Sequence, residues 1–216
     1  MKLLLLFFVA ALASAGQAQN LLLNPDFDDA DQLTGWQIGG EVIAVWSERD
    51  VDGSLSSGSA EVSSAEGGGN GIQQCVPVTE MTDYLLEGWV WIPSEQPSPD
   101  AAVGPRFVVA WFKSEDCGAL FIQPNAKTPS ADAELRDAWQ LFGETFTAPS
   151  GAMSGRLFVN PGNPDGLDCV GFQNPDGLDC TATAFFDALF VPEPAPWALQ
   201  VVALAALTWI GRRARA

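Results

Sequence analysis

Residues 20–191 form a series of short apolar or alternating runs, separated by Gly, Pro, Asn, Asp and Ser and almost devoid of helical period. This pattern predicts an all-β sandwich of roughly ten strands. Residues 83–92 and 106–113 are apolar on both faces, which is typical of central strands. We expect one helical turn, within residues 124–138, and strands at residues 21–23, 41–46, 59–63, 71–78, 83–92, 106–113, 119–122, 139–147, 154–160 and 181–191.

The first 18 residues have the three regions of a secretory signal peptide. Lys2 is followed by an apolar run over residues 3–12 and by the small residues Ala13, Ser14 and Ala15. Cleavage could follow Ala15 or Ala18. We therefore expect residues 1–18 to be removed and the sandwich domain, residues 19–191, to be exported.

Residues 192–216 form a tail with three parts in a fixed order. Pro192, Glu193 and Pro194 come first, residues 196–211 carry no charge, and a basic cluster of Arg212, Arg213 and Arg215 follows. As a helix the uncharged run would rise about 24 Å, somewhat less than a hydrocarbon core of about 30 Å. Arginines at its end favour retention on the cytoplasmic side.

The tail resembles the PEP-CTERM sorting signal of Gram-negative bacteria. The resemblance implies that an exosortase processes the protein at the inner membrane, in an organism that makes extracellular polysaccharide. The protein would first be anchored in that membrane and then reach the cell surface or the extracellular matrix. The alternative is a plain C-terminal anchor that is not processed.

Charge and composition exclude several classes of function. All 27 acidic residues but only six of the ten basic residues lie between residues 19 and 194, giving this part a net charge of −21. Such a surface repels phosphate backbones, so we expect no nucleic-acid binding. The chain has no histidine, which removes Ser-His-Asp and Cys-His catalysis and the commonest zinc ligands.

The four cysteines of this exported chain predict disulfides. Three pairings are possible. We favour Cys75–Cys117 together with Cys169–Cys180, because the last two cysteines lie in one turn-rich loop. This loop contains a duplicated heptapeptide, Asn-Pro-Asp-Gly-Leu-Asp-Cys, at residues 163–169 and 174–180. Its four aspartates resemble fragments of calcium loops, although a stapled surface insertion is the alternative.

A second resemblance covers nearly the whole body. The segments at residues 20–27 and 184–190 look like the first and last strands of galactose-binding-like jelly-roll modules. Residues 71–74 and 84–89 match the paired inner strands of those modules. The resemblance implies a jelly-roll β-sandwich, a fold that includes many carbohydrate-binding modules and also binders of other ligands.

In those modules a structural calcium ion commonly joins the first strand region to the last. The matching positions here are Asn24, Asp26 and Asp187, whose oxygens are ligands that calcium accepts. The alternative is that Asp187 accepts backbone hydrogen bonds and Asp26 stabilises a turn.

Aromatic side chains supply the candidate sugar site. Trp89 and Trp91 share one face of the strand at residues 83–92 with Glu87, and Trp111 lies on the next central strand. Tryptophan can stack on the apolar face of a sugar ring while a carboxylate binds its hydroxyls. The alternative is that these aromatics form the core of the sandwich.

Together these observations predict a non-catalytic surface protein that binds or organises extracellular polysaccharide. One alternative is a matrix protein held together by calcium bridges, without a specific glycan ligand. Another is a small hydrolase of unknown type, since paired carboxylates can work without histidine.

Overall fold

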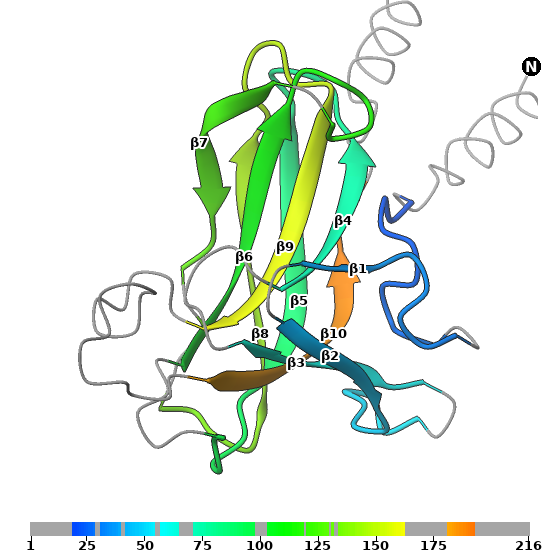
Figure 1. The fold of residues 1–216 in the computed structure, drawn as a ribbon, viewed down its shortest axis with the longest axis vertical. Helices are drawn as coiled ribbons and strands as arrows, with labels where there is room; N and C mark the ends of the chain where they lie inside the picture. Colours follow the sequence, from blue (N-terminus) through cyan, green and yellow to red (C-terminus); the bar gives the residue numbers. More distant parts are fainter. Residues whose placement is uncertain are drawn as a thin grey trace, which may run out of the picture. The chain divides into compact units, whose positions relative to one another are not determined.

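The computed structural model describes residues 19–28, 31–39, 42–54, 57–64, 71–97, 103–118, 120–129, 131, 134–162 and 181–192. Within these residues, the chain forms two five-stranded sheets, and all of their paired strands are antiparallel (Figure 1). The fold occupies Asn20–Val191.

Each sheet combines strands from distant parts of the chain. The first sheet has the order β1 (Gln37–Ile38), β4 (Ile72–Pro77), β9 (Ser154–Gly162), β6 (Val103–Phe112), β7 (Phe121–Lys127). The second has the order β2 (Val42–Ser47), β3 (Ser59–Ser64), β10 (Ala182–Phe190), β5 (Asp83–Trp91), β8 (Trp139–Thr147). Because β9 lies between β4 and β6, and β10 lies between β3 and β5, the two sheets have the interleaved order of a jelly-roll sandwich.

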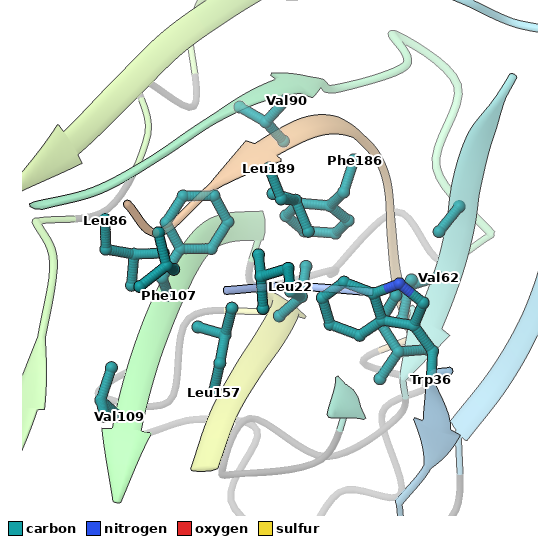
Figure 2. Close-up of a cluster of buried hydrophobic side chains, with 14 of the residues drawn as sticks. Leu22, Trp36, Val62, Leu86, Val90, Phe107, Val109, Leu157, Phe186 and Leu189 are labelled. Carbon is teal, nitrogen blue, oxygen red and sulfur yellow. The ribbon is translucent and has the colours of Figure 1, made fainter. Parts of the chain in front are cut away.

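The core lies between the two sheets. Alternate residues of each strand point inward, so that Phe107, Val109 and Leu157 of the first sheet meet Leu86 and Phe186 of the second. Figure 2 shows these side chains in one cluster. A buried apolar layer of this kind is the main stabilising contribution to a sandwich.

The expected strands agree closely with the observed ones. β8 has the predicted bounds, and β5 ends at Trp91, one residue earlier than expected. The strand expected at residues 119–122 is β7, which continues to Lys127. The sequence therefore predicts the all-β class and most strand positions correctly.

Three expectations are wrong. Residues 21–23 form bends and no strand; Asn24 and Phe27 have positive φ angles of 47° and 51°, which turn the chain. The helical turn is absent from the described part of residues 124–138: residues 124–127 belong to strand β7, in which Ala126 and Lys127 pair with β6, and the rest is irregular. The two supposed inner strands are not paired with each other, because β4 and β5 belong to different sheets.

One predicted disulfide is present, between Cys75 of β4 and Cys117 in the loop after β6. Residues 163–180, which include the duplicated heptapeptide and the expected Cys169–Cys180 bond, lie outside the described residues. Residues 1–18, the expected signal peptide, and residues 193–216 of the tail also lie outside them. Among the residues that are described, no helix has the length and apolar character needed to cross a membrane.

Candidate functional site

The tryptophans proposed as sugar ligands lie on the outward face of the second sheet. Trp89 and Trp91 alternate with the inward residues Leu86 and Val90 of β5 and are half-buried. In the strand register Trp91 stands between Phe185 of β10 and Trp139 of β8. We call Trp89, Trp91, Trp139 and Phe185 the tryptophan face; Glu87 is on the same side of β5, next to Trp89.

Another part of the chain already contacts this face. The guanidinium of Arg49, from the loop after β2, lies 4.3 Å from the ring centroid of Trp91 and 4.9 Å from that of Phe185. Trp139 packs edge-on against Trp91, with ring centroids 5.9 Å apart. The indole Nε1–H of Trp91 is buried without a hydrogen-bond partner. A sugar ring stacking on Trp91 would therefore compete with a cation–π contact.

Trp111 does not belong to the tryptophan face. It is only 3% exposed and points into the core from β6 of the first sheet. The alternation of β6 places it with Phe107 and Val109 on the inward side. Its proposed role in sugar binding is therefore contradicted, and the alternative expectation, a core residue, holds.

The proposed metal ligands are separated into two settings. Asn24 is nearly buried; its side-chain amide donates to the carbonyl oxygens of Gln32 and Thr34, and its own carbonyl accepts the indole N–H of Trp36. These contacts join Asn24 to residues 32–36 and hold this segment against the core. Asn24 therefore has a structural role in addition to any contact with a metal.

Asp187 lies among other carboxylates. Burial raises its pKa, two backbone hydrogen bonds from Val51 and Ala188 partly oppose this, and Asp50 and Asp26 raise it again, to about 7. Those bonds are 2.9 Å and 2.7 Å long. Asp187 therefore accepts backbone hydrogen bonds, as one of the two expectations states, and its burial, together with the nearby negative charges, makes its ionisation unfavourable.

A cation near Asp187 would relieve this repulsion, so the charge of the region suits calcium. The pKa of Asp26 is also raised, by burial and then by Asp28, Asp52 and Asp50. However, the described residues contain no group of three or more His, Cys, Asp or Glu side chains arranged to hold a metal ion. Backbone carbonyls would have to complete a calcium site here.

The outward face of the first sheet provides a second candidate surface, which is not among the sites predicted from the sequence. The strand registers align Gln37, Gln73, Phe158, Val108 and Lys127 across all five strands. Gln73 and Phe158 are half-buried, whereas Gln37 and Lys127 are exposed. We call this row, with the outward Arg106, Arg156 and Asn160 beside it, the amide face.

Asn160 has unused hydrogen-bonding capacity on the amide face. It is fully buried on β9; its Oδ1 accepts the N–H of Gly162 at 2.9 Å, and its Nδ2 has no partner. On β7, Asn125 Oδ1 is likewise buried without a partner. Buried polar groups in native proteins are normally hydrogen-bonded, so such groups indicate where a ligand or water can bind.

A loop at residues 113–118 is fastened over one end of the amide face. Cys117 is bonded to Cys75, its carbonyl accepts a 2.6 Å hydrogen bond from Arg156, and its N–H donates to Ser154 Oγ. Ser154 Oγ in turn donates to the Ser114 carbonyl at 2.6 Å. This loop therefore bounds one end of the amide face, and its bonds hold it in place. A long polymer bound to the face could not extend through the loop.

A signal for the amide face does exist in the sequence. Residues 154–160 alternate between the core residues Leu157 and Val159 and the outward residues Arg156, Phe158 and Asn160. An outward aromatic side chain between a cation and an amide could have been identified from this alternation.

No protein-family model and no curated protein matches this chain. Among solved structures, it is similar to the CBM22-1 xylan-binding domain from Paenibacillus barcinonensis Xyn10C, with 17% identity, 83% of this chain and 97% of that domain covered, and a TM-score of 0.53. At this identity the likeness concerns the fold.

Two larger proteins contain a similar fold. The Clostridium thermocellum endo-1,4-beta-D-xylanase 10B, solved with its CBM22-1 and GH10 modules and xylohexaose, has 13% identity and a TM-score of 0.52 over 82% of this chain. The enzymatically active domain of bacteriophage CBA120 tailspike protein 4 has 9% identity and a TM-score of 0.53 over 80%. The match spans 28% of the xylanase chain and 21% of the tailspike chain. The body therefore has the jelly-roll sandwich of carbohydrate-binding modules.

Proposed function

We propose that this protein is a non-catalytic surface protein that binds extracellular polysaccharide through the amide face. One observation carries the proposal: the outward face of the first sheet aligns Phe158 with the amides of Gln73 and Gln37 and has the unpartnered Nδ2 of Asn160 beside it. An aromatic ring can contact the apolar face of a sugar, and amides can bind hydroxyls. The similar xylan-binding domain supports a sugar as the ligand class.

The amide face is favoured over the tryptophan face for a physical reason. On the tryptophan face the ring of Trp91 is already in contact with Arg49, so a sugar would have to displace that guanidinium. On the amide face, the half-buried Phe158 and exposed Gln37 belong to one continuous row. The tryptophan face, with Trp89, Trp91 and Glu87, remains the competing site.

The two faces can be distinguished by one matched pair of variants of the full chain. Glycan arrays would first identify a bound polysaccharide, and titration would then compare Phe158→Ala with Trp89→Ala. We expect Phe158→Ala to weaken binding about three- to tenfold, the contribution of one aromatic contact, and Trp89→Ala to leave it unchanged. Thermal melting would verify that both variants are folded. The reverse pattern would assign the site to the tryptophan face, and the absence of any bound glycan would refute the function.

Calcium is a separate proposal, supported by the repulsion among Asp26, Asp50 and Asp187. It also keeps open the alternative of a matrix protein whose acidic groups are bridged by calcium. In that case calcium would make the protein self-associate without any glycan, which sedimentation would detect. A purely structural ion would raise the melting temperature and leave the protein monomeric.

Export and sorting rest on the terminal sequences alone. We infer that the signal peptide directs export, that the tail anchors the protein in the inner membrane, and that an exosortase then releases it to the surface. The intact mass of the protein recovered from cells tests this directly. A mass lacking the residues after the Pro-Glu-Pro segment is expected; a mass that retains them would indicate a plain anchor.

A further inference from the structure

The charged residues of the strands are divided completely between the two sheets. The five strands of the first sheet contain the cations Arg106, Lys127 and Arg156 and no acidic residue. The five strands of the second sheet contain no cation but several acids, namely Glu61, Asp83, Glu87, Glu144 and Asp187. In a chain with 27 acids and ten basic residues, an acid-free sheet with three cations is a distinct electrostatic feature.

The three cations surround the centre of the amide face. Val108 pairs with Phe158, and the neighbouring outward pairs are Arg106 with Asn160 on one side and Ala110 with Arg156 on the other. Lys127 ends the central row, opposite Val108. Successive outward residues of a strand are about 7 Å apart. Positive charge is therefore present on three sides of the Phe158 ring.

The accessible part of this charge comes from two residues. Lys127 is exposed and already has a contact within the protein, but its ammonium group has three N–H donors, so one contact leaves donors for a ligand. Arg156 is half-buried, with its guanidinium 5.0 Å from the ring centroid of Phe112 and one N–H bound to the Cys117 carbonyl. A guanidinium has five N–H donors, so this single hydrogen bond leaves Arg156 able to bind a carboxylate. Arg106 is 6% exposed and has a partner within the protein, so we do not count it among the groups that contact the ligand.

We propose that the ligand of the amide face is an anionic polysaccharide whose sugars carry carboxylates. This inference rests on the proposed glycan-binding function and specifies its ligand class. A neutral glycan would gain little from three cations, whereas a polyuronate would pair its carboxylates with Lys127 and Arg156. Because the acidic second sheet repels such a polymer, the field of the molecule would also direct it to the first sheet.

The test uses the full chain and two forms of one polymer. Polygalacturonate is compared with its carboxyl-reduced, neutral form at low salt, with chelator present so that calcium cannot bridge acids on protein and polymer. We expect binding to polygalacturonate to be at least about tenfold tighter and to weaken as salt rises through about 0.1 M, where screening becomes short-ranged. Equal binding of both forms would overturn the anionic ligand and leave the proposed function standing. Binding of neither form, on a glycan array that also shows no ligand, would refute the proposed function itself.

Three variants that each remove one positive charge locate the effect. Lys127→Gln and Arg156→Gln should each weaken polygalacturonate binding about three- to tenfold, whereas Arg49→Gln on the tryptophan face should have no effect. Lys127 is exposed, so its variant tests the proposal even if loss of Arg156 disturbs the loop that it contacts. Equal losses in all three variants would indicate a nonspecific charge effect and overturn the assignment. So would salt-sensitive self-association without polymer binding, in which the first sheet pairs with the acidic second sheet of another copy.

Discussion

At the scale of single residues, Asp187 couples the stability of the sandwich to pH. Its pKa is raised from an ordinary value of 3.8 to about 7 by burial and by the nearby Asp50 and Asp26. A carboxyl group with a raised pKa in the folded state favours folding when protonated. Its contribution is complete below pH 3.8 and is lost as pH rises through about 7.

We therefore expect the melting temperature in chelator to fall between about pH 4 and pH 7, and to fall less in Asp187→Asn. The variant has no carboxyl at this position and loses part of the contacts to Val51 and Ala188, so its stability should be lower at acidic pH and flatter in profile. Added calcium should raise the melting temperature of the natural protein most above pH 7. Equal pH slopes for both proteins would exclude this role of Asp187, and an unchanged melting temperature with calcium would exclude the ion.

The contacts and the exposure of single residues can be predicted from the sequence where one physical factor determines them. The Cys75–Cys117 bond was favoured from the count and spacing of cysteines, and it is present. The inward or outward direction of Trp111 could not be read from its own strand, because β6 is apolar on both faces and only the opposing sheet decides which face is buried. Phe158 differs: its outward direction follows from the alternation of residues 154–160, but its degree of exposure depends on neighbours from β4 and β6.

At the scale of elements, strands were predictable and the segments between them were less so. β8 and β5 follow from alternation and apolar content, which are local properties. The opening segment forms no strand and is held by individual hydrogen bonds. The Leu21 N–H donates to the Val191 carbonyl at 2.7 Å, and the Asn20 side chain donates to the Leu189 carbonyl at 2.7 Å and accepts the N–H of Val191 at 3.0 Å. These contacts join residues about 170 positions apart. Local sequence patterns contain no information about such long-range partners.

The pattern of the sequence also does not predict which strands pair with each other. The amide face exists because β9 inserts between β4 and β6, which places Phe158 beside Gln73 and Val108. The sequence predicts each of these strands separately, but the order of strands in a sheet is a property of the topology. The site could therefore be assembled only from the structure.

At the scale of the whole molecule, the separation of charge between the sheets gives salt two opposing effects. The chain has a formal net charge of −17, and self-repulsion of this kind destabilises a compact state. Salt screens that repulsion, with a Debye length of about 10 Å at 0.1 M. The same screening weakens the attraction between the cations of the first sheet and an anionic polymer.

We therefore expect the melting temperature of the full chain in chelator to rise as NaCl increases from about 20 mM to about 300 mM, while its affinity for polygalacturonate falls. Arg49→Gln should follow the natural protein in both responses. Lys127→Gln should keep the rise in melting temperature, because one charge changes the net repulsion little, but should show a shallower loss of affinity. A melting temperature that falls with NaCl would mean that attraction between the two sheets outweighs the repulsion among the acids. The cations of the first sheet would then serve the fold, which would remove the main reason to expect an anionic ligand there.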